Sequence, residues 1–223
     1  MENFQPAIIF DLDGLMLDTE RISLNAWKKA ALDFDYNLTE EVFVQAIGRK
    51  ISDTEALFKS LFGNDFPFHE VRAKRLEYGE MHLKEFGMPK KPGLLELLVL
   101  LENNKLKKAI ATSTHKKFAE EKLSLAGLEN RFSVIITGDQ VHLGKPEPEI
   151  FLKAASALSV PPQECFVLED SEPGIEAAFR AGMIPIMVPD LQTPSLETKN
   201  RAYKIFNSLF EVSSFFVELG ICK

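Results

Sequence analysis

Five short runs of apolar residues restrict the possible fold more than any other feature of this sequence. They lie at residues 7–10, 108–112, 133–137, 165–168 and 184–188, and they are rich in β-branched and aromatic residues. Their apolar residues are consecutive instead of alternating, which is typical of strands buried on both faces. The runs therefore predict a parallel sheet that helices cover on two sides.

Stretches with helical features separate these runs. Residues 92–104 begin with a proline and end in asparagines, and residues 116–128 contain Gly127 at a position that suits a helix end. Residues 147–159 and 172–183 follow later runs in the same way. Strands that alternate with helices form right-handed βαβ units. The predicted fold class is therefore α/β, with a doubly wound, Rossmann-like parallel sheet.

One long interval breaks this alternation. From residue 19 to about residue 86, apolar residues recur at helical spacing, as at Leu24, Trp27 and Ala31, without a strand pattern. We predict an all-helical cap domain inserted after the first strand. The expected boundaries are residues 1–16 and 89–223 for the α/β core and 17–88 for the cap, with connecting segments at 15–18 and 87–92.

The composition narrows the possible functions. The chain of 223 residues has 45% hydrophobic residues and a net charge of -7. It contains no block of lysines or arginines, which argues against nucleic acid or an anionic membrane surface as the main partner. No apolar run approaches the length of a membrane span, and Cys165 and Cys222 indicate neither a disulfide framework nor a metal site. We expect a soluble, cytoplasmic monomer.

Polar residues lie at or beyond the ends of four predicted strands. In an open α/β sheet these ends share one edge, where ligands bind. Residues far apart in the sequence are therefore expected to meet there: Asp11 and Asp13, Thr112 and Ser113, Lys145, and Glu169 with Asp170.

Each of these residues also has a simpler interpretation when taken alone. The sequence Asp-x-Asp-Gly can form a turn, and Thr112 with Ser113 can cap the next helix. Lys145 alone would be read as a solvated surface lysine. An EF-hand is excluded because Leu15 and Met16 occupy positions that such a loop reserves for a ligand and a glycine. A P-loop is excluded because Pro146 follows the lysine.

Four stretches taken together are far more specific. In chain order they are "DLDG" (11–14), "ATST" (111–114), "GKPEPEIF" (144–151) and "LEDSEPGIEAA" (168–178). This set resembles the motifs of the haloacid dehalogenase superfamily, in the branch with a helical cap inserted after the first motif. The resemblance covers nearly the whole chain. It implies a relationship to small sugar-phosphate phosphatases and β-phosphoglucomutases.

The first motif fits phosphoryl transfer. Side chains two residues apart in an extended chain point to the same side, so Asp11 and Asp13 can both address one phosphorus atom. The resemblance implies that Asp11 attacks phosphorus and forms an aspartyl-phosphate. It also implies that Asp13 protonates the leaving oxygen and later takes a proton from water.

A phosphate dianion repels carboxylates, so the site needs positive charge. Mg²⁺ fits because it binds through carboxylates, a substrate oxygen and waters. The resemblance implies that Asp11 and Asp170 supply side-chain oxygens and that Asp13 supplies its backbone carbonyl. Glu169 either binds the metal or lies beside its ligands.

The remaining candidates bind phosphate or the rest of the substrate. Thr112, Ser113 and Lys145 are expected to hold the phosphoryl oxygens as charge redistributes. Gly48 and Arg49, at the end of a predicted cap helix, are expected to reach the substrate. The alternative for Arg49 is a solvated cation near a helix C-terminus.

Three functions remain open, and the first is favoured. It is a Mg²⁺-dependent phosphatase that hydrolyses a small phosphorylated metabolite, most simply a sugar phosphate. The second is a phosphosugar mutase of the β-phosphoglucomutase type, but in that family a histidine usually occupies the position of Ser23. The third is a catalytically silent binding module, which would be expected to lack part of the catalytic set. That set is complete: Asp11, Asp13, Lys145 and Asp170.

Overall fold

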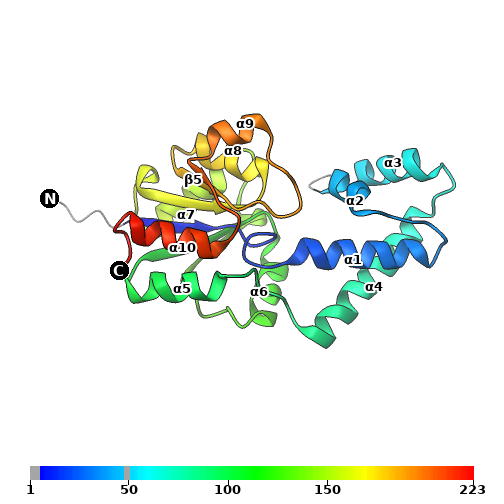
Figure 1. Ribbon diagram of the computed structural model, residues 1–223, viewed down its shortest axis with the longest axis horizontal. Coiled ribbons are helices and arrows are strands. Elements are labelled where there is room, and N and C mark those ends of the chain that lie inside the picture. The colour runs from blue at the N-terminus through cyan, green and yellow to red at the C-terminus, as the bar shows by residue number, and fades with distance from the viewer. Residues whose placement is uncertain (1–5, 48–50) are drawn as a thin grey trace. The chain divides into compact units, whose positions relative to one another are not determined.

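The computed structural model describes residues 6–47 and 51–223, and the chain divides into two compact units (Figure 1). The core unit comprises Met1–Asp18 and Met88–Lys223, and the helical unit comprises Thr19–Gly87. Each unit buries its own set of apolar side chains and is described by itself.

A six-stranded parallel sheet organises the core unit, in the order β3-β2-β1-β4-β5-β6. The chain begins at β1, builds outwards to β3 on one side, and then crosses to build β4, β5 and β6 on the other. The order therefore reverses between β1 and β4, where open α/β sheets bind ligands at the carboxyl ends of the strands. The strands span Ala7–Phe10 (β1), Lys107–Thr112 (β2), Val134–Thr137 (β3), Cys165–Glu169 (β4), Ile184–Met187 (β5) and Lys204–Ile205 (β6).

Helices cover both faces of this sheet, because alternate residues of each strand point to opposite sides. Ile9 and Val167 pack with side chains of α7 and α8 on one face. On the other face, Phe166 of β4 contacts Phe216 of α10. The helices of the core unit are α5 (Leu94–Asn103), α6 (Lys116–Leu125), α7 (Glu149–Leu158), α8 (Glu172–Arg180), α9 (Leu196–Arg201) and α10 (Leu209–Glu218), with short 3₁₀ turns at Gly138–Gln140 (η1) and Pro162–Glu164 (η2). The prediction of a doubly wound, Rossmann-like α/β fold is confirmed.

Predicted and observed strands differ mainly at their ends. The strand β1 matches the predicted range, whereas β2 begins at Lys107, β3 begins at Val134 and β4 extends to Glu169. The strand β6 was not predicted. Its two residues, Lys204 and Ile205, are both exposed, so they form no apolar run that the sequence pattern could reveal.

The described part of the helical unit contains α1 (Thr19–Leu32), α2 (Glu40–Ala46), α3 (Ile51–Phe62) and α4 (Phe68–Phe86), and no strand occurs in residues 19–47 and 51–87. The helices α1 and α4 pack together. Trp27 anchors the core of this unit, with ring centroids 5.2 Å from Phe58 and 5.8 Å from Phe68. None of the described helices combines the length and apolar character that a bilayer crossing requires.

The two segments that lead out of the core unit and back into it are paired with each other. Leu17 and Lys90 form an antiparallel bridge. The backbone N–H of Asp18 donates to the carbonyl of Pro89 at 3.0 Å, and that of Lys91 donates to the carbonyl of Met16 at 2.9 Å. The exit and the return of the chain are therefore hydrogen-bonded neighbours.

The packing of α10 on the sheet gives the first testable prediction. Phe216 is fully buried and its ring lies 5.3 Å from that of Phe166. Phe216→Ala is expected to lower the free energy of unfolding by about 3–5 kcal/mol, because it leaves a cavity between helix and sheet. Phe210→Ala on the same helix, where the side chain is 48% exposed, is the matched control and should cost clearly less. Urea unfolding of both variants measures the difference, and equal losses would contradict this account of the packing.

Candidate active site

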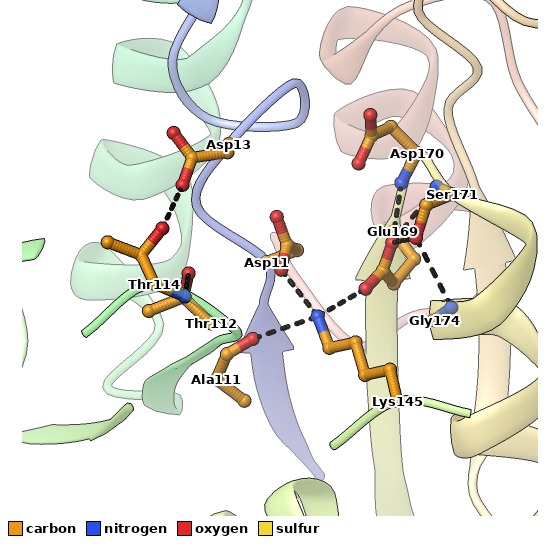
Figure 2. A network of polar contacts seen from close by, with 10 residues as sticks. All are labelled: Asp11, Asp13, Ala111, Thr112, Thr114, Lys145, Glu169, Asp170, Ser171 and Gly174. Atoms are coloured by element: carbon orange, nitrogen blue, oxygen red, sulfur yellow. Dashed lines mark hydrogen bonds and ion pairs between the residues drawn. The ribbon is translucent and has the colours of Figure 1, made fainter. Parts of the chain in front are cut away.

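The carboxyl ends of β1 and β4 bring together residues that are far apart in the sequence. Asp11 directly follows β1, Glu169 ends β4, and Asp170 follows it. Backbone pairing aligns the two strands, with Phe10 beside Leu168, and the N–H of Asp11 donates to the carbonyl of Leu168 at 3.0 Å. Figure 2 shows the resulting group of polar side chains at this edge. Its position is the one where the strand order reverses.

Lys145 lies at the centre of this group. Its Nζ contacts Asp11 Oδ1 at 2.5 Å, Glu169 Oε1 at 2.5 Å and the carbonyl oxygen of Ala111 at 3.2 Å. An ammonium group has three N–H donors, so these three acceptors match its full capacity. The side chain is only 6% exposed, which excludes the interpretation of Lys145 as a solvated surface lysine.

Glu169 is completely buried, and both of its carboxylate oxygens have partners. Oε1 pairs with Lys145, and Oε2 accepts hydrogen bonds from the N–H of Asp170, the N–H of Ser171 and the Ser171 hydroxyl at 2.8–3.0 Å. Gly174 packs so closely that a Cβ there would overlap the carboxyl group of Glu169. Glu169 therefore links Lys145 to the start of α8.

The buried carboxyl groups outnumber the cation between them. The pKa of Asp11 is raised to about 7: burial raises it most, Lys145 opposes the rise, and Glu169 adds to it. Burial, Glu169 and Asp11 raise the pKa of Asp170 well above its usual value. Burial lowers the pKa of Lys145, but Asp11 and Glu169 outweigh that effect and raise it. Three acidic groups around one ammonium would leave an excess of negative charge if all were ionised, and the raised pKa values of Asp11 and Asp170 reflect this repulsion together with burial.

This excess suits an oxygen-seeking divalent cation. Mg²⁺ is usually held by one or two carboxylates together with waters and substrate oxygens. Asp11 and Asp170 supply such oxygens, although residues 6–47 and 51–223 contain no group of three Asp, Glu, His or Cys that could hold a metal alone. Gly14 packs against Asp170, and a Cβ there would overlap the Asp170 carboxylate. The donor chemistry therefore fits a cation at Asp11 and Asp170.

Asp13 points to different partners from those of Asp11 (Figure 2). Its Oδ2 accepts a hydrogen bond from Thr114 Oγ1 at 2.6 Å, and its Oδ1 pairs with Lys122 Nζ at 2.5 Å. The expectation that Asp11 and Asp13 address one side assumed extended chain. In the structure the strand ends at Phe10, residues 11 and 12 are irregular, and Asp13 forms an isolated bridge with Leu17 across the turn at 14–16, so the alternation of side chains in a strand no longer applies.

The predicted phosphate-binding pair divides between a buried and an exposed residue. Thr112 is 1% exposed, and its hydroxyl accepts a hydrogen bond from the N–H of Thr114 at 3.1 Å. Ser113 is exposed, and its carbonyl lies so close to Gly138 that a Cβ there would overlap it. Gly48 and Arg49, the predicted substrate-binding residues of the cap, lie outside the described residues.

Thr114 and Lys122 are site residues that sequence reasoning missed. Thr114 belongs to the "ATST" stretch, so its nearness to the site could have been inferred from the same strand end. Lys122 is one of several lysines on α6, together with Lys116 and Lys117. Which of these lysines reaches Asp13 depends on the direction and rotation of α6, which the sequence pattern does not specify.

Comparisons with known proteins agree with the geometry. A family model described as haloacid dehalogenase-like hydrolase matches residues 8–188. The chain is 35% identical to a phosphorylated carbohydrates phosphatase of Thermotoga maritima, over 79% of this chain and 82% of the relative. It is 31% identical to a β-phosphoglucomutase of Bacillus subtilis, over 82% of each chain. A crystal structure of a putative β-phosphoglucomutase from Thermotoga maritima superposes with a TM-score of 0.79 at 30% identity, over 96% of this chain and 99% of that one. This chain belongs to the haloacid dehalogenase-like hydrolase family.

Proposed function

We propose that this protein is a Mg²⁺-dependent phosphatase that hydrolyses a small phosphate monoester, a sugar phosphate, through an aspartyl-phosphate intermediate. The observation that carries the proposal is the placement of Asp11. Lys145 binds its Oδ1, and Figure 2 shows the second carboxylate oxygen directed away from Lys145. A carboxylate that is held on one oxygen and free to present the other is suited to nucleophilic attack.

The reaction follows from the residues at this edge. The Asp11 carboxylate attacks phosphorus, the bond from phosphorus to the ester oxygen breaks, and Asp13 gives that oxygen a proton. Water then attacks the aspartyl-phosphate, Asp13 takes the proton from the water, and phosphate leaves with Asp11 restored. Asp11, Asp170 and the backbone carbonyl of Asp13 would hold Mg²⁺, which when bound would supply positive charge against the phosphate dianion.

Lys145 and the loop after β2 serve the phosphoryl group in this proposal. Lys145 neutralises part of the charge at Asp11, and Glu169 keeps Lys145 in place from the other side. The buried hydroxyl of Thr112 orients the loop through Thr114, which leaves the exposed Ser113 to donate to phosphoryl oxygens. Glu169 orients Lys145 in this proposal and does not bind the metal, since its oxygens already accept hydrogen bonds from Lys145 and from the Asp170 N–H.

The helical unit is the proposed source of substrate selectivity. We assign residues 17–88 to a cap, with Gly48 and Arg49 as candidate contacts to the substrate. The relatives support a phosphorylated carbohydrate as the substrate class, because one of them is named for that activity.

Hydrolysis is favoured over phosphosugar mutase activity by the identity of residue 23, which is a serine. Its Oγ accepts a hydrogen bond from Arg75 Nη2 at 2.6 Å, within the helical unit. The mutases of this family usually have a histidine at this position, and it helps to restrain the general acid until a sugar is bound. The mutase remains the second candidate, because the chain is similar to a β-phosphoglucomutase over most of its length.

The covalent mechanism predicts a severe defect when Asp11 is replaced. Asp11→Asn keeps the shape of the side chain and removes the attacking charge, so phosphate release is expected to fall by about 10³-fold or more while the fold remains. The measurement is phosphate release from a panel of sugar phosphates with Mg²⁺, and circular dichroism checks folding. Asp65→Asn, the same change at an exposed position of the helical unit, is the control. Near-normal turnover by Asp11→Asn would rule out the aspartyl-phosphate.

Turnover is also expected to depend on a divalent cation. Removal of divalent metal with EDTA is expected to abolish turnover, because the acidic side chains repel the phosphate dianion when no cation lies between them. Added Mg²⁺ is expected to restore turnover because it neutralises this repulsion. Turnover that persists in EDTA would contradict the assignment of Asp11 and Asp170 as metal ligands. Wild-type protein in buffer with Mg²⁺ serves as the reference.

The products formed from β-glucose 1-phosphate separate hydrolase from mutase. With β-glucose 1-phosphate, a trace of glucose 1,6-bisphosphate and Mg²⁺, any turnover is expected to release phosphate without accumulation of glucose 6-phosphate. The two products are measured in parallel with coupled assays. Accumulation of glucose 6-phosphate faster than release of phosphate would replace the hydrolase assignment with the mutase.

A further inference from the structure

The contacts of Asp13 come from an element other than its own. Asp13 lies in the segment after β1, whereas Thr114 lies beyond β2 and Lys122 lies on α6. The two donors divide the carboxylate between them, Lys122 on Oδ1 and Thr114 on Oδ2. The side chains of Lys122 and Asp13 are 26% and 23% exposed, so the pair is partly shielded from water. These two donors define the orientation of the carboxylate in this structure.

We propose that Lys122 is a positioning residue for Asp13, which rests on the proposed function. Lys122 stays on Oδ1 throughout the reaction. Thr114 gives up Oδ2, and that oxygen exchanges protons with the leaving group and then with water.

The unequal strength of the two contacts supports this division of roles. A hydrogen bond from an ammonium group to a carboxylate is charge-assisted and roughly twice as strong as one between neutral groups. The hydroxyl of Thr114 can rotate towards another acceptor at little cost. Oδ2 is therefore the oxygen that can form a hydrogen bond with a substrate or a water, while Oδ1 remains bound to Lys122.

Anchoring of Asp13 matters because its backbone lies outside regular secondary structure. Asp13 pairs only through an isolated bridge with Leu17, and the turn that begins at Gly14, where φ is 83°, follows directly. An acid–base group that is displaced by about 1 Å can lose about 100-fold in rate. The ion pair with Lys122 adds a restraint on the Asp13 carboxylate itself.

A purely structural ion pair is the competing explanation. In that case Lys122 would only tie α6 to the turn after β1, and its loss would affect stability and every step of turnover alike. A positioning role acts through Asp13 and affects the steps in which Asp13 transfers a proton. The two explanations therefore differ in their dependence on the leaving group and on Asp13 itself.

The experiment compares Lys122→Met, Lys122→Arg and the control Lys117→Met, which changes an exposed lysine on the same helix. The substrates are p-nitrophenyl phosphate, whose leaving group needs little help from an acid, and the sugar phosphate that wild-type protein turns over fastest with Mg²⁺. Lys122→Met is expected to lower kcat for the sugar phosphate by about 10- to 100-fold with little change in KM. Release of p-nitrophenol in the first turnover should fall much less. Lys122→Arg should recover most of the loss, and Lys117→Met should match wild type.

The double variant with Asp13→Asn tests whether Lys122 acts through Asp13. With p-nitrophenyl phosphate, Lys122→Met is expected to reduce steady-state turnover in the wild-type background and to add little in the Asp13→Asn background. Losses that multiply would assign Lys122 to a structural role and overturn the proposal. Full kcat of Lys122→Met on the sugar phosphate, or an equal fall in the first turnover of both substrates, would overturn it as well.

The same data separate this proposal from the one on which it rests. If wild-type protein releases phosphate and only the Lys122 comparisons fail, the positioning role alone is wrong. If wild-type protein releases no phosphate from either substrate, the phosphatase assignment and the positioning role fall together.

Discussion

The ammonium group of Lys145 is the interaction on which the candidate site depends. It joins the residue after β1, the end of β4 and the carbonyl of Ala111 on β2, so three neighbouring strands meet at one buried cation. A carboxylate buried at Asp11 or Glu169 without this partner would carry a large desolvation cost. Removal of one member of such a group is costly because the others stay buried. The contacts of Lys145 therefore stabilise the fold and also fix the orientation of the Asp11 carboxylate.

The sequence was most informative where side chains are buried on both faces of the sheet. Consecutive apolar residues predicted β1 at 7–10 and located the other long strands to within a residue or two of their observed ends. The strand β6 has no such pattern, because its residues are exposed. Its pairing depends on the neighbouring strand β5 and not on the character of its own residues.

The candidate site was predictable to the level of residues at one edge, but their contacts were not. Asp11, Lys145, Glu169 and Asp170 do meet, as their positions after the strands predicted. The direction of Asp13 could not be inferred, because the regular strand ends at Phe10 and Asp13 lies in irregular chain with an isolated bridge to Leu17. The buried pairing of Glu169 with backbone N–H groups was equally hidden, since it depends on how α8 begins against Gly174.

The pairing of the two connecting segments has a consequence for the way the chain can vary. Leu17 and Lys90 form an antiparallel bridge, so the chain between them is a closed loop with respect to the core unit. The helical unit is the part of the chain that forms this loop. The entropy of closing a loop grows slowly with its length, by about 0.6 kcal/mol for each doubling. An insertion of another size can therefore occupy this position at small cost to the core, provided that its two ends emerge as neighbours. The sheet and its carboxylates can stay constant while the inserted part diverges.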